Sequence, residues 1–142
     1  MKAIRHTGIV ITNLEKSLPF YRDVLGLKIQ RDVMEQGEFI DRISGLKNVK
    51  VRTIKMSADA GNLVELLWYE SYPRESEGAK EICTPGVSHL AFTVENIDYE
   101  YQRLKKRRIV FHCPPQISPD GKAKVTFCRD PEGNLIELVE ML

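Results

Sequence analysis

Two short segments of this chain are nearly identical, and each carries an unexpected acid. Residues 61–66 read GNLVEL and residues 133–138 read GNLIEL. Each copy sets one carboxylate, Glu65 or Glu137, inside a run of apolar residues. A buried carboxylate without a partner costs several kcal/mol, so each must form an ion pair, stay protonated or bind a cation. An inward Arg or Lys, or a place at the wet edge of a sheet, would satisfy either one alone.

A histidine accompanies each acidic segment. His6 and His89 lie in the strands expected to open the two halves of the chain, and His89 precedes the apolar residues 90–92. A single histidine of this kind, such as His89, is more often a core residue than a ligand. Equivalent placement of two histidines and two glutamates instead predicts one divalent metal site, because these donors suit such an ion and leave two octahedral positions open. Ni, Co, Mn, Fe and Zn all accept these donors, so the metal's identity stays open.

The elements that would position these residues follow the same order twice: strand, helix, strand, strand, strand. Periodicity and turn residues predict strands over 4–11, 27–33, 49–57 and 62–69 and then over 87–94, 109–113, 122–128 and 134–139. Asn13 and Asn96 are the expected helix caps, and Pro19 is expected to kink the first helix. Residues 38–44 are expected to form a short helix between the second and third strands. We therefore expect module one over 1–70, a polar linker over 71–86 and module two over 87–142, all within one domain.

Composition narrows the class of protein. The chain has 142 residues and a formal net charge of +1, which gives no electrostatic case for binding nucleic acid or an acidic membrane surface. No apolar stretch approaches the roughly 20 residues of a membrane span, and the first residues lack the apolar core of a signal peptide. The odd number of cysteines, three, argues for a reducing compartment. We expect a cytoplasmic protein that acts on a small molecule.

Four motifs make the chain similar to the vicinal oxygen chelate superfamily, which includes glyoxalase I, methylmalonyl-CoA epimerase, extradiol dioxygenases and bleomycin-resistance proteins. They are HTGIVI at 6–11, FYRDVLGL at 20–27, HLAFTV at 89–94 and FCRDPEGNLIEL at 127–138. The resemblance implies an α+β fold in which two tandem βαβββ modules form an open, cupped mixed sheet with helices on its outer face. It also implies that His6, Glu65, His89 and Glu137 bind the metal, and that the protein forms a homodimer.

Within that superfamily, the presence of Glu65 favours the four-ligand branch, to which glyoxalase I and the epimerase belong. Three-ligand members resemble a set of His6, His89 and Glu137 alone. Glyoxalase I usually carries an arginine where this chain has Val10 and an asparagine where it has Tyr69.

The resulting hypothesis is a metal-dependent isomerase, epimerase or lyase that stabilises an enolate beside a substrate carbonyl. Glu137 is our first choice for the base and Glu65 the second. Tyr69 and Phe39 are expected to line the substrate pocket, with Phe39 and Ile40 forming either an apolar lid or ordinary core. Two alternatives stay open: an extradiol-type dioxygenase that uses ferrous iron, and a non-catalytic protein that binds a small apolar ligand.

Overall fold

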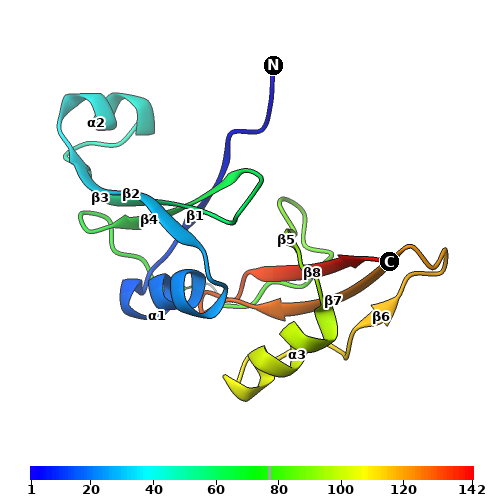
Figure 1. Cartoon of the computed structure of the whole chain (residues 1–142). Helices are drawn as coiled ribbons and strands as arrows, with labels where there is room; N and C mark the ends of the chain where they lie inside the picture. Colours follow the sequence, from blue (N-terminus) through cyan, green and yellow to red (C-terminus); the bar gives the residue numbers. More distant parts are fainter. Residues whose placement is uncertain (77) are drawn as a thin grey trace. The chain divides into compact units, whose positions relative to one another are not determined.

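The computed structural model describes residues 1–76 and 78–142 (Figure 1). The chain divides into two compact units, Met1–Ser76 and Glu77–Leu142. Each unit contains one four-stranded mixed sheet with its helices. The prediction of an α+β fold built from two tandem βαβββ modules is therefore confirmed.

The first unit places its opening strand beside its last. Its sheet has the order β1-β4-β3-β2, in which β1 runs parallel to β4 and the other pairs are antiparallel. The elements are β1 (His6–Val10), α1 (Leu14–Pro19), the π-helical turn η1 (Phe20–Val24), β2 (Lys28–Gln36), α2 (Glu38–Ser44), β3 (Lys50–Ser57) and β4 (Leu63–Tyr69).

The second unit repeats this topology without a counterpart of α2. Its sheet has the order β5-β8-β7-β6, and β5 runs parallel to β8. The elements are β5 (His89–Thr93), α3 (Ile97–Lys106), β6 (Gln116–Ile117), β7 (Ala123–Arg129) and β8 (Leu135–Met141).

The helices begin where their capping residues predict. Asn13 Oδ1 accepts a hydrogen bond from the Lys16 amide at 3.0 Å, and Asn96 Oδ1 accepts one from the Tyr99 amide at 2.8 Å. Pro19 ends the regular α-helical part, because it has no N–H to donate and its ring crowds the preceding turn. The chain continues as the wider turn η1, in which the Leu25 amide donates to the Phe20 carbonyl at 2.9 Å.

One predicted strand is wrong. Residues 109–113 form only an isolated bridge, between Phe111 and Cys128, and the short strand β6 starts later, at Gln116. Pro114 and Pro115 explain the difference, since neither can donate a ladder hydrogen bond and both fix φ. The apolar residues at 109–111 suggested a strand that these two prolines do not allow to continue.

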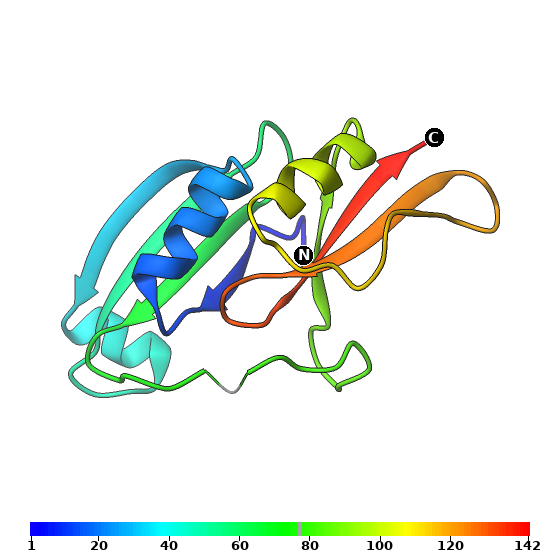
Figure 2. The same ribbon diagram turned by 90° about the horizontal axis from the view of Figure 1, so that it is seen from below.

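The two faces of the first sheet have different roles. One face carries Ile54, Met56 and Leu66, all fully buried, and α1 lies across it (Figure 2). On the other face, α2 is anchored by Ile40, which packs in a cluster with Val49 and Val51. This second face is the one that carries Glu65. Among the described residues, no helix is long and apolar enough to cross a bilayer.

Candidate functional site

The parallel pairing of β1 with β4 brings His6 and Glu65 together. Gly8 lies opposite Glu65 in the register, and His6 lies two residues earlier on the same face of β1. His6 Nε2 is 3.1 Å from Glu65 Oε2. Glycine at position 8 leaves room for the Leu67 side chain, since a Cβ there would come within 3.2 Å of Leu67 Cδ1. Glu65 itself is buried, with 8% of its surface exposed.

The second unit repeats this geometry with the same register. Ala91 lies opposite Glu137, and His89 lies two residues earlier on β5. His89 Nε2 is 3.2 Å from Glu137 Oε2. The two histidine–glutamate pairs are therefore equivalent in topology, in the atoms that face each other and in the distance between them.

The neighbours of the two carboxylates differ. Lys55 lies directly across from Glu65, and its Nζ is 3.3 Å from Glu65 Oε1. The matching position across from Glu137 is Phe127, whose ring packs edge-on against the His89 ring at 5.4 Å between centroids. In the part of the chain that is described, no lysine or arginine forms an ion pair with Glu137. The sequence left open an inward cation for each glutamate, and the structure supplies one, Lys55, to Glu65.

The second ring nitrogens of the two histidines also differ. Ser88 Oγ lies 2.7 Å from His89 Nδ1, which fixes the orientation of that ring. His6 Nδ1 is buried and has no hydrogen-bond partner among the described residues. If Nδ1 of either ring carries the proton, the lone pair of Nε2 faces a carboxylate oxygen. A cation between the two atoms relieves that repulsion.

The donor atoms of each pair fit a divalent ion. Metal–nitrogen and metal–oxygen bonds of about 2.0–2.2 Å at a right angle place two donor atoms about 3 Å apart. The distances of 3.1 and 3.2 Å agree with that spacing. Within residues 1–76 and 78–142, no cluster of three or more His, Cys, Asp or Glu side chains forms, so each unit offers two of the expected ligands.

The first pair opens into a pocket of about 790 Å³ within the first unit. His6, Glu65 and Lys55 line it, together with both residues that the sequence suggested for substrate contact, Tyr69 and Phe39. Its other lining residues are Arg31, Met34, Glu35, Gln36, Ile40, Ile43, Ser44, Thr53 and Leu67.

The structure distinguishes between the two roles considered for α2. Ile40 is core, because it is 8% exposed and packs against Val49. Phe39 and Ile43 are 72% and 64% exposed and line the wall of the pocket. The helix α2 therefore presents Phe39 and Ile43 to the pocket and is held in place by the buried side chain of Ile40.

Sequence reasoning missed Lys55 and Arg31. Alternation along β3 places Lys55 on one face with Thr53, but that pattern does not say which face. Only the register with β4 puts Lys55 opposite Glu65. Arg31 could not be placed either, because its face depends on an irregularity in β2.

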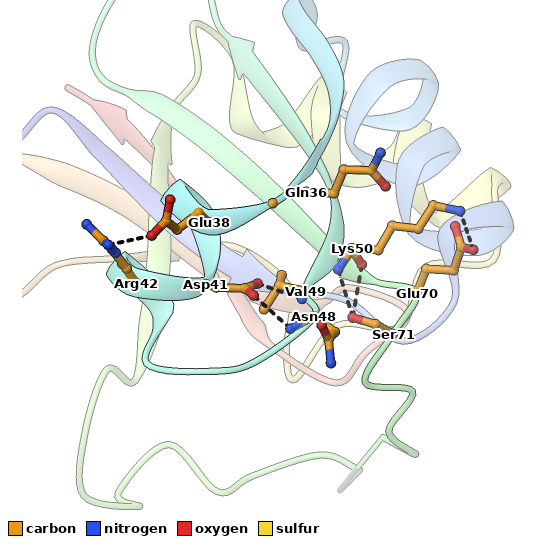
Figure 3. A pocket seen from close by; sticks show the side chains of 10 residues that line it. Gln36, Glu38, Asp41, Arg42, Asn48, Val49, Lys50, Glu70 and Ser71 are labelled. Carbon is orange, nitrogen blue, oxygen red and sulfur yellow. Dashed lines mark hydrogen bonds and ion pairs between the residues drawn. The ribbon is translucent and has the colours of Figure 1, made fainter.

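A second hollow, of about 710 Å³, is lined by α2 and by residues 48–50 and 70–71 (Figure 3). Its charged side chains are satisfied locally: Lys50 pairs with Glu70 at 2.7 Å, and Arg42 pairs with Glu38. Asp41 accepts hydrogen bonds from the backbone amides of residues 48 and 49. Since these groups partner one another and no histidine lines the hollow, its polar residues hold α2 in place.

Comparison with known proteins shows the family and the fold of this chain. Residues 3–138 match the Glyoxalase/Bleomycin resistance protein/Dioxygenase superfamily. The chain belongs to this superfamily. The solved glyoxalase family protein from Bacillus cereus has the same fold, with a TM-score of 0.87 at 24% identity, covering 100% of this chain and 95% of that one.

Two relatives within the superfamily illustrate its range. The uncharacterized protein YaeR of Escherichia coli is 28% identical over 141 residues, which cover 99% of this chain and 97% of YaeR. The lactoylglutathione lyase of Schizosaccharomyces pombe is 31% identical over 143 residues. That alignment covers 96% of this chain but 46% of the yeast enzyme, so the chain spans about half its length.

Proposed function

We propose that this protein is a divalent-metal-dependent isomerase, epimerase or lyase of the glyoxalase type, which removes a proton beside a substrate carbonyl. The observation that carries the proposal is the matched pair of histidine–glutamate contacts, at the same register in both modules. In both modules the histidine presents Nε2 to a carboxylate oxygen, at 3.1 and 3.2 Å. The lactoylglutathione lyases among the relatives add support for lyase chemistry.

We propose that His6, Glu65, His89 and Glu137 together hold one ion. Bound there, the ion would supply a Lewis acid that stabilises negative charge developing on the carbonyl oxygen. Ser88 contributes by orienting the His89 ring through its contact with Nδ1.

We assign the base to Glu137 and an anchoring role to Glu65. Lys55 Nζ contacts Glu65 Oε1, so this carboxylate is held at both oxygens, by Lys55 and by His6. Glu137 faces the Phe127 ring on the neighbouring strand and has more freedom to turn toward a substrate. Its side chain is also more exposed than that of Glu65, 19% against 11%.

The pocket in the first unit would bind the body of the substrate. Leu67 and Tyr69 on β4 and Phe39 on α2 give it apolar surface, which excludes water from one side of the reacting group. A pocket of about 790 Å³ suits a small organic molecule.

Exchange of the α-proton tests the proposal directly. The protein, loaded in turn with Ni²⁺, Co²⁺, Mn²⁺ or Zn²⁺, is incubated in D₂O with a panel of 2-oxo acids, 2-oxoaldehyde–thiol adducts and 2-methyl acyl thioesters, and proton NMR follows loss of the α-proton signal. We expect exchange with the wild type and a loss of at least about 100-fold in Glu137→Gln, since general base catalysis contributes about 10²–10⁴-fold.

The control is Glu95→Gln, which removes an exposed carboxylate from the same unit and should leave the rate unchanged. Exchange at the wild-type rate in Glu137→Gln, with metal still bound, would remove Glu137 from the chemistry. Oxygen uptake with catechols in place of proton exchange would favour the dioxygenase alternative.

A further inference from the structure

We propose that Arg31 and Lys55 form a subsite for the anionic group, a carboxylate or a phosphate, of a small amphipathic substrate. The apolar part of that substrate lies along the α2 wall. This inference names the class of substrate that the pocket of the first unit binds. It rests on the proposed function only for the reaction that this substrate undergoes. The binding itself involves residues of the first unit alone.

A β-bulge decides which face of the sheet Arg31 occupies. The register steps from Ile29 to Arg31 while the partner strand advances by one residue, so Gln30 is an additional residue. With regular alternation Arg31 would lie opposite Ile54, on the buried face covered by α1. The bulge instead places it opposite Lys55, on the face of the pocket. Bulges often redirect a side chain in this way beside a binding site.

Arg31 and Lys55 are then direct cross-strand neighbours of like charge, an arrangement that is destabilising by itself. Lys55 has Glu65 as a partner at 3.3 Å. Arg31 is exposed, and its guanidinium group forms no hydrogen bond or ion pair within the described residues. An anion between the two cations would remove the repulsion, and the planar guanidinium matches the oxygens of a carboxylate or phosphate.

Three other arginines of this unit have a carboxylate partner, whereas Arg31 has none among the described residues. Between His6 and Tyr69 the chain has four arginines, and three of them have a carboxylate partner. The pairs are Arg22 with Asp23, Arg42 with Glu38 and Arg52 with Asp32. The Arg52 pair is on the opposite face of the same two strands and is bidentate, with distances of 2.8 and 2.7 Å. Of these four arginines, the one that lines the pocket is thus the one without a carboxylate partner among the described residues.

The two ends of the pocket differ: basic residues line one end, and Phe39 and Ile43 line the other beside Glu35 and Gln36. Its basic residues lie beside His6 and Glu65, while α2 follows the far end of β2 and contributes Phe39 and Ile43. A ligand with an acidic head and a short branched apolar tail fits this polarity, with its head nearest the histidine–glutamate pair. The pocket is long enough for such a ligand, because Arg31 and Glu35, which both line it, are four residues and about 13 Å apart along β2.

Three probes of matched size test the subsite: 4-methylpentanoate, 3-methylbutyl phosphate and the neutral 4-methylpentanamide. Each is titrated by NMR into the full-length protein after treatment with EDTA, so that no metal contributes to anion binding. We expect at least one of the two anions to bind about tenfold more tightly than the amide, the size of one charge-assisted contact in a partly exposed site. Which anion binds more tightly identifies the head group.

Arg31→Met should abolish this preference while leaving the weak binding of the amide unchanged. Arg74→Met, an exposed arginine of the same unit outside the pocket, is the matched control and should keep the preference. Equal binding of anions and amide, no binding of any probe, or an undiminished preference in Arg31→Met would overturn the subsite. Because the protein is metal-free here, none of these outcomes bears on metal binding or proton exchange, which test the proposed function separately.

Discussion

Glu65 and Glu137 hold the same place in two copies of one strand pattern, but the residues across from them give them different chemistry. Lys55 holds one oxygen of Glu65, whereas an aromatic ring faces Glu137. If the residues across from both carboxylates were the same, either carboxylate could act as the base. In the proposed function, Lys55 opposite Glu65 and Phe127 opposite Glu137 would make the first carboxylate an anchor and leave the second free to turn.

Lys55 should compete with a metal for Glu65. We predict that Lys55→Met binds Co²⁺ or Ni²⁺ more tightly than the wild type, by up to about fivefold, because a partly buried ion pair of this kind contributes about 1 kcal/mol at most. Isothermal titration calorimetry measures the two dissociation constants. Lys50 lies on the same strand as Lys55 but pairs with Glu70. Lys50→Met should therefore bind the metal as tightly as the wild type does. Weaker metal binding in Lys55→Met would contradict the competition.

The pair on the opposite face of the sheet gives a prediction for pH. Hydrogen bonds from Arg52 hold the pKa of Asp32 below its ordinary value of 3.8. A carboxyl group with a lowered pKa in the folded state stabilises the protein above the unfolded pKa, and this contribution is lost as the pH falls through the folded pKa. Asp32→Asn should therefore reduce the free energy of unfolding at pH 6, by about 1 kcal/mol or less, and this reduction should shrink as the pH falls below 3.8.

Urea unfolding at pH 6 and at pH 3 measures this difference. Asp98→Asn, which removes an acid with a more exposed side chain, provides the comparison. A penalty for Asp32→Asn that stays constant between pH 6 and pH 3 would show that the Arg52 pair does not lower this pKa.

At the scale of the elements, two sets of contacts attach α2 to the rest of the first unit. Ile40 packs into the core beneath it, and the Asp41 carboxylate accepts backbone hydrogen bonds from Asn48 at 2.8 Å and Val49 at 2.7 Å. Asn48 has a positive φ of 54°, so these bonds also hold a turn that few residues adopt. The apolar wall of the pocket depends on this attachment.

We predict that Asp41→Ala loosens α2, at a cost of about 1–3 kcal/mol, because two backbone donors lose a charged acceptor. Hydrogen exchange should accelerate at residues 40–50 and stay unchanged in the second unit. Arg42→Ala is the matched control, since it removes only an exposed ion pair with Glu38 and should cost little. Unchanged exchange in Asp41→Ala would show that Ile40 alone holds the helix.

The sequence predicts most elements of this fold, because their signals are local. The short helix at 38–44 is found where the spacing of Phe39, Ile40 and Ile43 places it, and both asparagine caps are found as predicted. Residues 109–113 were predicted wrongly because apolar content outweighed the two prolines that follow. The bulge at Gln30 has no comparable signal, since a register is a property of two strands, and the face that Arg31 occupies depends on it.

At the scale of the whole molecule, the three cysteines should differ in reactivity. Cys83 and Cys113 are exposed, whereas Cys128 is buried, and burial raises the pKa of its thiol to about 12. The thiolate is the reactive form, so Cys128 should be inert in the folded protein. We predict that Ellman's reagent at pH 8 modifies two thiols per chain rapidly and the third only after denaturation. Rapid modification of all three would show that β7 opens readily.

The repeat predicts which residues should form the site but not how the two halves meet. A duplicated motif identifies His6, Glu65, His89 and Glu137 without any knowledge of register, and each half then places its own pair as that motif requires. Joint binding of one ion by both pairs stays a prediction, because it depends on interactions beyond a single unit. The homodimer and the cytoplasmic location also stay predictions.

The most direct test of this account is the number of divalent ions bound per chain and its dependence on each half. Calorimetric titration of EDTA-treated protein with Ni²⁺ or Co²⁺ should give one ion per chain. Glu65→Gln and Glu137→Gln should each weaken binding at least about tenfold, as the loss of a shared ligand requires, while Glu75→Gln and Glu95→Gln should not. Two ions per chain, or unchanged affinity in either ligand variant, would contradict a single site built from both modules.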